Sequence, residues 1–397
     1  MLGFKFRHRG RTAIDRDHIV PGVFERLGEI GPHGLLVFCQ QDATRAVVLF
    51  HGAAFSPDRL RNLWLCRIRP ALTQVDFPSS TVAMVTDTAS EAPEAPDIPT
   101  IPGSAHPAYR AQVSEKPELP VLIAVPHAGR VYPESIRQRM RSPEYAMKRL
   151  EDRMVDRLAE AIVAETDAPL IVAYAPRAML DLNRAPDDMD WSMVAGARDR
   201  GRGNSRANRR ARSGLGLVPR RLHGLGEIWR DRLTQADLDA RVETIHEPYH
   251  RAVADTLSHL RRRWGAALLL DLHSMPPLKK RHPDDKPAEF VIGDRFGASS
   301  HGSLTAAALH FLGQQGRRVA HNRPYAGGYV LDRHGKPSVG IHAMQLEICR
   351  SLYLDARHEE PSARLPALAR MLAGLVQTLA AEVVPPARDH GLPLAAE

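Results

Sequence analysis

The chain of 397 residues has few cysteines and no long apolar run. Cys39, Cys66 and Cys349 lie far apart, are odd in number and show no metal-binding spacing, which excludes a disulfide framework and a cysteine-held metal site. No apolar stretch approaches the roughly 20 residues of a membrane-spanning helix. The first ten residues lack the apolar core of a secretory signal. We therefore expect a cytoplasmic protein without a membrane partner.

Aromatic residues make up only 6% of the chain, and its most basic stretch contains none. Nine arginines and a single acid, Asp199, lie between Arg198 and Arg221 and carry much of the net charge of +8. Such a stretch is typical of a nucleic-acid surface, or of a basic rim that attracts a small anionic substrate. Single-strand binders stack bases on interleaved aromatic side chains, which are absent here. We therefore expect no nucleic-acid partner.

Composition divides the chain into three parts. Residues 1–83 mix short apolar runs with arginine-rich segments and show no sustained helical or strand period. Residues 84–117, rich in proline and alanine at first, have the composition of a disordered linker. Because Met84 opens the linker, residues 1–83 are either translated upstream sequence or a small appended domain. The regular pattern from residue 118 predicts a catalytic domain over residues 118–385.

Within this domain, buried strands alternate with helices. An apolar residue at every fourth position predicts a helix over Tyr145–Thr166, and a second long helix is predicted over Gln235–Arg263. Continuous apolar runs predict strands at Val121–Val125, Leu170–Ala173, Ala266–Leu272, Phe290–Ile292, Val319–Ala320 and Ala343–Ile348. The alternation predicts an α/β fold whose sheet is covered by helices on both faces.

Polar clusters follow the carboxyl ends of three predicted strands, where open α/β sheets bind ligands. They are Val125–Gly129, Asp181–Arg184 and Leu270–Ser274. His127 and His273 are the natural pair of metal ligands, because neutral imidazole suits Zn²⁺ and a hydrolytic zinc site takes three protein ligands. The usual signature of two histidines and a glutamate on one helix is absent. A single histidine at such a position is more often structural or simply solvated than a metal ligand.

The third ligand should be a carboxylate. Glu134, Glu151, Asp152 and Asp156 are the candidates. The last two share one face of the predicted helix, which could also be a solvated face paired with neighbouring arginines. Asp271 could orient the imidazole two residues later through a hydrogen bond, or merely end its strand.

Two further residues suggest chemistry. Glu347 lies between apolar neighbours in a predicted strand, and an unpaired charge buried there would be very costly. It is therefore functional or paired, with Arg350 as the nearby partner. Arg184 has the planar fork that meets a carboxylate with two parallel hydrogen bonds. Its alternative is a surface ion pair with Asp187 or Asp188.

Together, these motifs resemble the N-formylglutamate amidohydrolase family. The motifs are Pro126–Pro133, Glu151–Asp152 with Asp156, Asp181–Pro186, Asp271–Pro277, Gly293–Arg295, Asn322–Tyr329 and Gln345–Ile348. The resemblance covers residues 118 to 380 approximately, in consistent order, and extends to the zinc carboxypeptidase and aspartoacylase group. It implies a three-layer α/β/α fold around a mixed, mostly parallel sheet.

The resemblance also implies a metal site and a base. His127 and His273 correspond to zinc ligands. The third ligand departs from the pattern of the wider group, because no glutamate follows His127 at three residues and Glu134 lies too far along. Asp152 is our choice for this position. Glu347 corresponds to the general base.

The resemblance further implies substrate contacts. Asn183 and Arg184 correspond to a carboxylate clamp. Arg177 would stabilise the oxyanion, although its spacing is one residue shorter than in aspartoacylases. Apart from the resemblance, Tyr325 or Tyr329 could donate a hydrogen bond to the substrate from the Asn322–Tyr329 loop, or simply pack.

The expected activity is zinc-dependent hydrolysis of N-formyl-L-glutamate to formate and L-glutamate, in the setting of histidine catabolism. The substrate has two carboxylates, so a second cation is expected from Arg177 or a loop arginine. One alternative is a deacylase of another N-acyl amino acid or small peptide. The other is a non-catalytic protein that binds anions or nucleic acid, against which His127, His273 and Glu347 argue together. No sequence feature bears on the oligomeric state.

Overall fold

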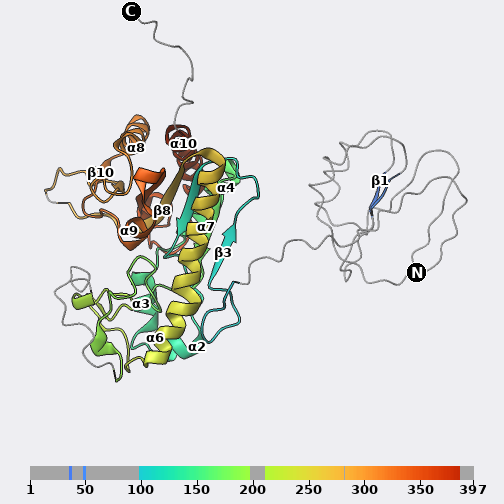
Figure 1. The fold of residues 1–397 in the computed structure, drawn as a ribbon. Helices are drawn as coiled ribbons and strands as arrows, with labels where there is room; N and C mark the ends of the chain where they lie inside the picture. The colour runs from blue at the N-terminus through green and yellow to red at the C-terminus, as the bar shows by residue number, and fades with distance from the viewer. Residues whose placement is uncertain (1–34, 38–47, 51–97, 197–210, 281, 385–397) are drawn as a thin grey trace, which may run out of the picture. The chain divides into compact units, whose positions relative to one another are not determined.

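The structure, a computed structural model, describes residues 35–37, 48–50, 98–196, 211–280 and 282–384. The chain divides into two compact units, residues 1–94 and 95–397. In the first unit, strands β1 (Leu35–Val37) and β2 (Val48–Phe50) pair antiparallel. The rest of residues 1–83, to which our two hypotheses refer, lies outside the described residues. The other helices and strands of the described residues all belong to the second unit (Figure 1).

A mixed, mostly parallel sheet of seven strands runs through the second unit, and the family resemblance implied a mixed, mostly parallel sheet. Its strands are β3 (Tyr109–Gln112), β4 (Val121–Val125), β5 (Leu170–Ala173), β8 (Ala267–Met275), β9 (Phe290–Gly293), β10 (Val319–His321) and β11 (Ile341–Cys349). They lie in the order β10-β9-β11-β8-β4-β5-β3. The neighbours pair in parallel, except for β9 with β11 and β3 with β5. A separate small pair is formed by β6 (Arg221–Leu222) and β7 (Gly226–Glu227).

Helices of very different length surround the sheet. They are α2 (Glu134–Arg139), α3 (Pro143–Leu150), α4 (Val155–Thr166), α6 (Gln235–Arg241), α7 (Glu247–Trp264), α8 (Gly302–Gln314), α9 (Tyr329–His334) and α10 (Leu365–Val383). Single turns are η3 (Trp191–Met193), η5 (Pro337–Val339) and η6 (Arg350–Leu352). The helix predicted over Gln235–Arg263 is observed as α6 and α7, joined by the π-helical turn η4 (Val242–His246). No helix among the described residues is long and apolar enough to cross a membrane.

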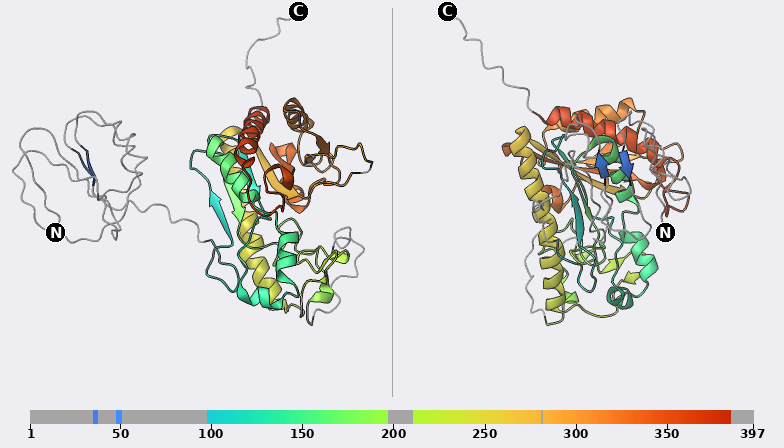
Figure 2. Two further views of the ribbon diagram at one scale, coloured as in Figure 1. Left: turned by 180° about the vertical axis from the view of Figure 1, so that it is seen from behind. Right: turned by 90° about the vertical axis from the view of Figure 1, so that its right-hand side faces the viewer.

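Each face of the sheet has its own apolar core. Because alternate strand residues point to opposite faces, β4 contributes Val121, Ile123 and Val125 to one core and Leu122 and Ala124 to the other. The first core also contains residues of α4, α8 and α10, and Figure 2 shows α8 and α10 side by side. The second core contains residues of α7, the long yellow helix of Figure 1. The central strands are therefore buried on both faces, which explains their continuous apolar runs.

The single helix predicted over Tyr145–Thr166 is wrong, because two helices, α3 and α4, occupy this range. Between them the chain turns inward, and Met154 takes a left-handed conformation with φ 55°. The backbone N–H of Asp152 donates to the carbonyl of His127 at 2.9 Å, a tertiary contact that replaces helical pairing. Consequently Asp152 and Asp156 do not share one helix face. Local apolar spacing does not reveal such an interruption, because tertiary contacts override propensity.

The predicted linker extends too far towards the C-terminus. Residues Tyr109–Gln112 form β3 at the edge of the sheet and pair with β5. Ile101 and Ala108 are almost completely buried in the second core. The folded unit therefore begins well before residue 118. The prolines just before β3 lie in an ordered segment next to the edge of the sheet.

Candidate active site

Two neighbouring strands place four polar side chains on one face of the sheet. β8 and β11 run parallel with Asp271 beside Gln345 and His273 beside Glu347. All four are buried. Earlier along β8 the same face is apolar, as Leu269 shows. The polar group therefore lies at the carboxyl ends of the strands, where an open α/β sheet binds its ligands.

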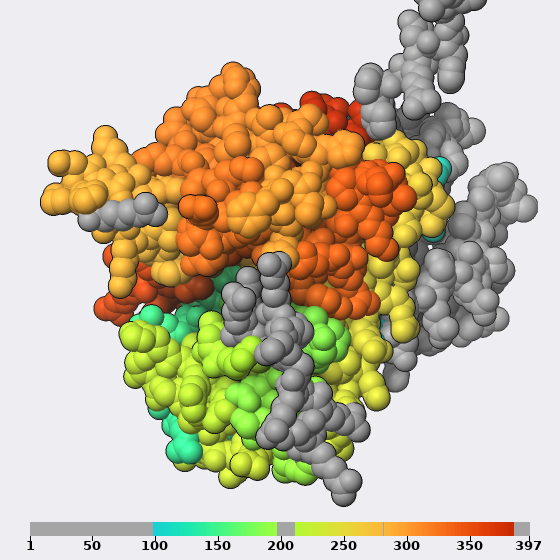
Figure 3. All heavy atoms as spheres, turned by 60° about the vertical axis from the view of Figure 1, so that its left-hand side comes forward, coloured from blue at the N-terminus to red at the C-terminus, as the bar shows by residue number. Residues whose placement is uncertain are grey.

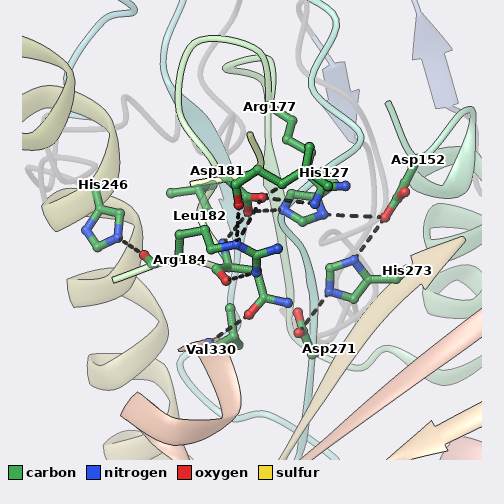
Figure 4. A network of polar contacts seen from close by, with 12 residues as sticks. His127, Asp152, Arg177, Asp181, Leu182, Arg184, His246, Asp271, His273 and Val330 are labelled. Atoms are coloured by element: carbon green, nitrogen blue, oxygen red, sulfur yellow. Dashed lines mark hydrogen bonds and ion pairs between the residues drawn. The ribbon is translucent and has the colours of Figure 1, made fainter. Parts of the chain in front are cut away.

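His127, Asp152 and His273 come together at this end of the sheet. Each offers one ligand atom, and these atoms all lie within 4.8 Å of one another. Oδ2 of Asp152 is 2.9 Å from Nδ1 of His273 and 3.7 Å from Nδ1 of His127. Figure 4 shows both imidazoles pointing towards this carboxylate. The arrangement could hold a metal ion with two nitrogens and one oxygen.

A second carboxylate holds the far nitrogen of each imidazole. Nε2 of His127 lies 2.7 Å from Oδ1 of Asp181, and Nε2 of His273 lies 2.9 Å from Oδ2 of Asp271. Because a carboxylate only accepts, Nε2 carries the hydrogen and Nδ1 is left with its lone pair in the neutral ring. Nδ1 of His127 is buried without a hydrogen-bond partner among the described residues. These are the features of imidazoles oriented to bind a metal.

The charges in this group also fit a cation. Burial opposes ionisation of Asp152, but its contacts with His127 and His273 outweigh this effect and lower its pKa. Burial lowers the pKa of His273, but Asp271 and Asp152 overcome this and raise it well above its ordinary value. A metal ion would compete with a proton for the lone pair on Nδ1 of His273.

Asp181 is held by an arginine as well as by a histidine. Arg177 donates from Nε to Oδ2 of Asp181 at 3.0 Å. Burial would raise the pKa of Asp181, but the positive charge of Arg177 and the hydrogen bond from His127 hold it well below its usual range. Asp181 therefore stays ionised next to Nε2 of His127. The oxyanion role of Arg177 stays a prediction.

Glu347 is buried beside the candidate metal ligands. Burial raises the pKa of Glu347 to about 7. Its Oε1 accepts a hydrogen bond from Nε2 of Gln345 at 2.9 Å. Arg350, the alternative partner considered for Glu347, donates instead to Ser274 Oγ at 3.1 Å and lies 3.5 Å from Asp152. A buried carboxylate whose pKa lies near neutrality is suited to accept a proton.

Asn183 and Arg184 lie in the turn that follows β5. Arg184 donates from Nε to the carbonyl of Leu215 at 2.9 Å and from Nη1 to that of Asn183 at 2.7 Å. The alternative partner Asp188 lies 3.9 Å from Nε. Two donors of the fork thus support the turn, and the carboxylate clamp stays a prediction.

The two tyrosines of the Asn322–Tyr329 motif have different surroundings. Tyr325 is half-buried, and burial, followed by the charges of Glu347 and Asp152, raises its pKa. Tyr329 packs against the rings of His246 and His250, and its hydroxyl accepts from Arg333. Tyr325 is therefore the tyrosine close to the candidate site.

The other candidates for the third ligand have different partners. Glu134 is exposed on α2 and accepts from Gln138. Asp156 forms a two-point ion pair with Arg130 at 2.9 and 2.6 Å. Glu151 accepts from Arg153 at 3.0 Å. Of the four carboxylates, Asp152 is the one that faces both histidines.

Three contacts of the site were missed by the sequence analysis. They are the hydrogen bond of Asp181 to His127, that of Gln345 to Glu347, and the ion pair of Arg350 with Asp152. Gln345 could have been found, because it lies two residues before Glu347 and so shares its strand face. The other two contacts join distant segments and leave no local signal.

The loop that carries His127 requires a glycine. A Cβ added at Gly129 would lie 2.1 Å from the carbonyl oxygen of Ala175. We expect Gly129→Ala to lower the free energy of unfolding by about 1–3 kcal/mol, because the backbone must shift. Urea unfolding measures the change. The matched control is Gly313→Ala in α8, where the methyl meets nothing within 4 Å and should be neutral or stabilising. Equal stability of both variants would contradict this account.

The sequence is similar to those of known proteins of one family. Residues 119–354 match the N-formylglutamate amidohydrolase family. The N-formylglutamate deformylase of Pseudomonas putida is 29% identical over 241 residues, which cover 60% of this chain and 82% of that protein. The deformylase of Pseudomonas aeruginosa is 27% identical over 242 residues, with 60% and 83% covered.

Solved structures agree on the fold. The N-formylglutamate amidohydrolase of Ralstonia eutropha is 29% identical, with a TM-score of 0.62 over 70% of this chain and 98% of that chain. An Agrobacterium tumefaciens protein, 18% identical with a TM-score of 0.52, shares the fold over 70% of this chain and 96% of its own.

The protein is thus an enzyme of the class that hydrolyses amides. More particularly, the chain belongs to the N-formylglutamate amidohydrolase family, whose match spans more than half of its length.

Proposed function

We propose that the protein hydrolyses N-formyl-L-glutamate to formate and L-glutamate with the help of a zinc ion. The observation that carries the proposal is the group of His127, Asp152 and His273, with Glu347 buried next to it. The names of the two deformylases and of the Ralstonia eutropha amidohydrolase support the substrate.

The residues present fit zinc. Nδ1 of His127, Nδ1 of His273 and a carboxylate oxygen of Asp152 would hold it, and three such ligands are typical of catalytic zinc sites. When bound, the ion lowers the pKa of a water molecule and polarises a carbonyl oxygen. Asp181 and Asp271 keep both rings in the tautomer that leaves Nδ1 available.

In this mechanism Glu347 moves the proton. Its carboxylate takes a proton from the attacking water and delivers it to the nitrogen of the leaving glutamate. Burial suits it to both steps, since it raises the pKa of Glu347 to about 7 and the carboxyl can therefore gain and lose a proton near neutral pH. The C–N bond of the formamide breaks, and formate retains the oxygen from water.

The substrate is held by groups around this centre. We assign a carboxylate of the substrate to Asn183 and Arg184, and a hydrogen bond to Tyr325. Arg177 stabilises the negative oxygen that develops on the formyl group. It lies close enough to Glu347 and Asp152 that their charges contribute to raising its own pKa against the effect of burial.

The same proposal includes the expected setting. The helices in the two cores support a three-layer α/β/α arrangement like that of zinc carboxypeptidases. The family membership supports a small-molecule partner, a cytoplasmic location and a place in histidine catabolism.

The test is formate release from N-formylglutamate by the purified protein, before and after removal of metal with a chelator. We expect activity that falls at least about 1,000-fold without metal and returns with Zn²⁺, because the metal supplies several kcal/mol of transition-state stabilisation. N-acetylglutamate and N-formylalanine are the comparison substrates. A preference for N-acetylglutamate would show that the enzyme is not specific for the formyl group. A preference for N-formylalanine would contradict the preference for an acidic side chain. Failure to bind zinc would contradict the mechanism.

A further inference from the structure

A buried chain of hydrogen bonds connects the start of α9 with Glu347. The backbone N–H of Val330 donates to Oδ1 of Asn183 at 3.0 Å. Nδ2 of Asn183 lies 3.4 Å from Oε1 of Gln345, and Nε2 of Gln345 lies 2.9 Å from Oε1 of Glu347. All four residues are less than a tenth exposed.

The direction of every hydrogen bond in this series follows from the first one, which the backbone N–H of Val330 donates. A backbone N–H can only donate, so the atom of Asn183 that faces Val330 is the amide oxygen. The NH₂ group of Asn183 must then face Gln345, whose oxygen accepts. The NH₂ group of Gln345 is left to face Glu347, and Oε1 of that carboxylate must accept.

The Asn183 amide is also fixed by packing. A Cβ added at Gly328 would lie 2.4 Å from Oδ1 and 2.8 Å from Cγ of Asn183, so the absent side chain makes room for this amide. The backbone on each side is held by buried imidazoles. Nε2 of His250 lies 3.0 Å from the carbonyl of Leu182, and Nε2 of His246 lies 3.0 Å from that of Arg184. The amide is therefore held in one orientation.

We propose that Gln345 is a positioning residue for the general base. Its NH₂ group holds Oε1 of Glu347 as a permanent acceptor, so the proton that is transferred travels on Oε2. The proposal rests on the proposed function, in which Glu347 is the base. It also gives Asn183 a second task, since one hydrogen of its NH₂ group supports Gln345 and the other remains for the substrate.

The first test is Gln345→Met, which keeps the length of the side chain and removes its donor and acceptor. We expect kcat to fall about 10- to 100-fold, because a base displaced by about 1 Å loses roughly this much. KM should change by less than about twofold, since the interaction acts on the chemical step. Zinc content and the thermal unfolding midpoint are measured on the same preparation.

The decisive measurement is the same substitution in a Glu347→Gln background. If Gln345 acts through Glu347, Gln345→Met should lower the residual kcat by less than about twofold there, because coupled residues are not additive. A structural role would lower kcat equally in both backgrounds, and this outcome would overturn the proposal. Full activity of Glu347→Gln alone would instead refute the base itself.

A second variant disturbs the chain from its far end. Gly328→Ala leaves Gln345 and Glu347 intact but pushes on the Asn183 amide, and the φ of −136° at Gly328 is open to any residue. We expect KM to rise in both backgrounds because Asn183 also contacts the substrate, and we expect the fall in kcat to shrink to less than about twofold in the Glu347→Gln background. Gly302→Ala in α8 is the control, since its methyl would meet nothing within 4 Å. A fall in kcat from Gly328→Ala that is equally large without Glu347 would contradict a coupling of Asn183 to Glu347 through Gln345.

Discussion

Replacing Glu347 by glutamine is expected to lower kcat about 100- to 10,000-fold, the range that general acid–base catalysis contributes. The amide has the shape of the carboxyl group and still presents an oxygen to Nε2 of Gln345, so the local packing should survive. It cannot take up a proton near neutral pH. Steady-state formate release from N-formylglutamate measures the loss.

Zinc content separates this effect from loss of the metal. Glu347 is not one of the three grouped ligands, so the variant should bind as much zinc as the natural protein. Glu160→Gln is the matched control. Glu160 lies on α4, outside the candidate site, and forms an ion pair with Arg110 at 2.7 Å. A kcat for Glu347→Gln within tenfold of that control would show that another group carries the proton.

Replacing His273 by alanine is expected to abolish stable zinc binding and, with it, at least about 1,000-fold of the activity. The variant loses one of three ligand atoms and leaves the buried Asp152 and Asp271 without their shared partner. Metal analysis after dialysis, together with a competition titration, gives the affinity.

A milder substitution beside His273 tests whether zinc affinity depends on how this ring is held. Asp271→Asn keeps His273 and weakens only the hydrogen bond to its Nε2, so zinc affinity should fall about 10- to 100-fold rather than disappear. His342→Ala is the control, because His342 is a buried histidine at the opposite end of β11. Equal zinc affinity of His273→Ala and His342→Ala would remove His273 from the metal site.

The strands were predictable where apolar side chains are continuous. Val121–Val125 and Leu170–Ala173 were predicted with their observed bounds, since central strands are apolar on both faces. β8 was predicted to end at Leu272 but continues to Met275. The apolar run ends early because His273 and Ser274 are polar, yet both are buried in the sheet. A prediction that takes only apolar residues as buried therefore places the end of such a strand too early.

The candidate ligands were predictable by position and resemblance, but their neighbours were not. His127 follows β4 and His273 lies near the end of β8, and a position at the end of an apolar run is a local feature. The contact of Asp181 with His127 depends on how the turn after β5 folds back towards β4. The inward turn at Asp152 depends likewise on a tertiary hydrogen bond to His127. Local sequence does not specify such contacts.

Figure 3 shows a face on which segments distant in sequence, coloured green, yellow and orange, lie against one another. The ladders that build the site are equally non-local, for Ala124 pairs with Asp271 and His273 with Glu347. Loop closure must precede each such pairing, so topologies of this kind fold slowly. We therefore expect the candidate ligands and the base to come together only once β8 has joined β4 and β11 has joined β8, since β11 lies between β8 and β9. Zinc uptake during refolding should therefore report the completion of the sheet rather than its nucleation.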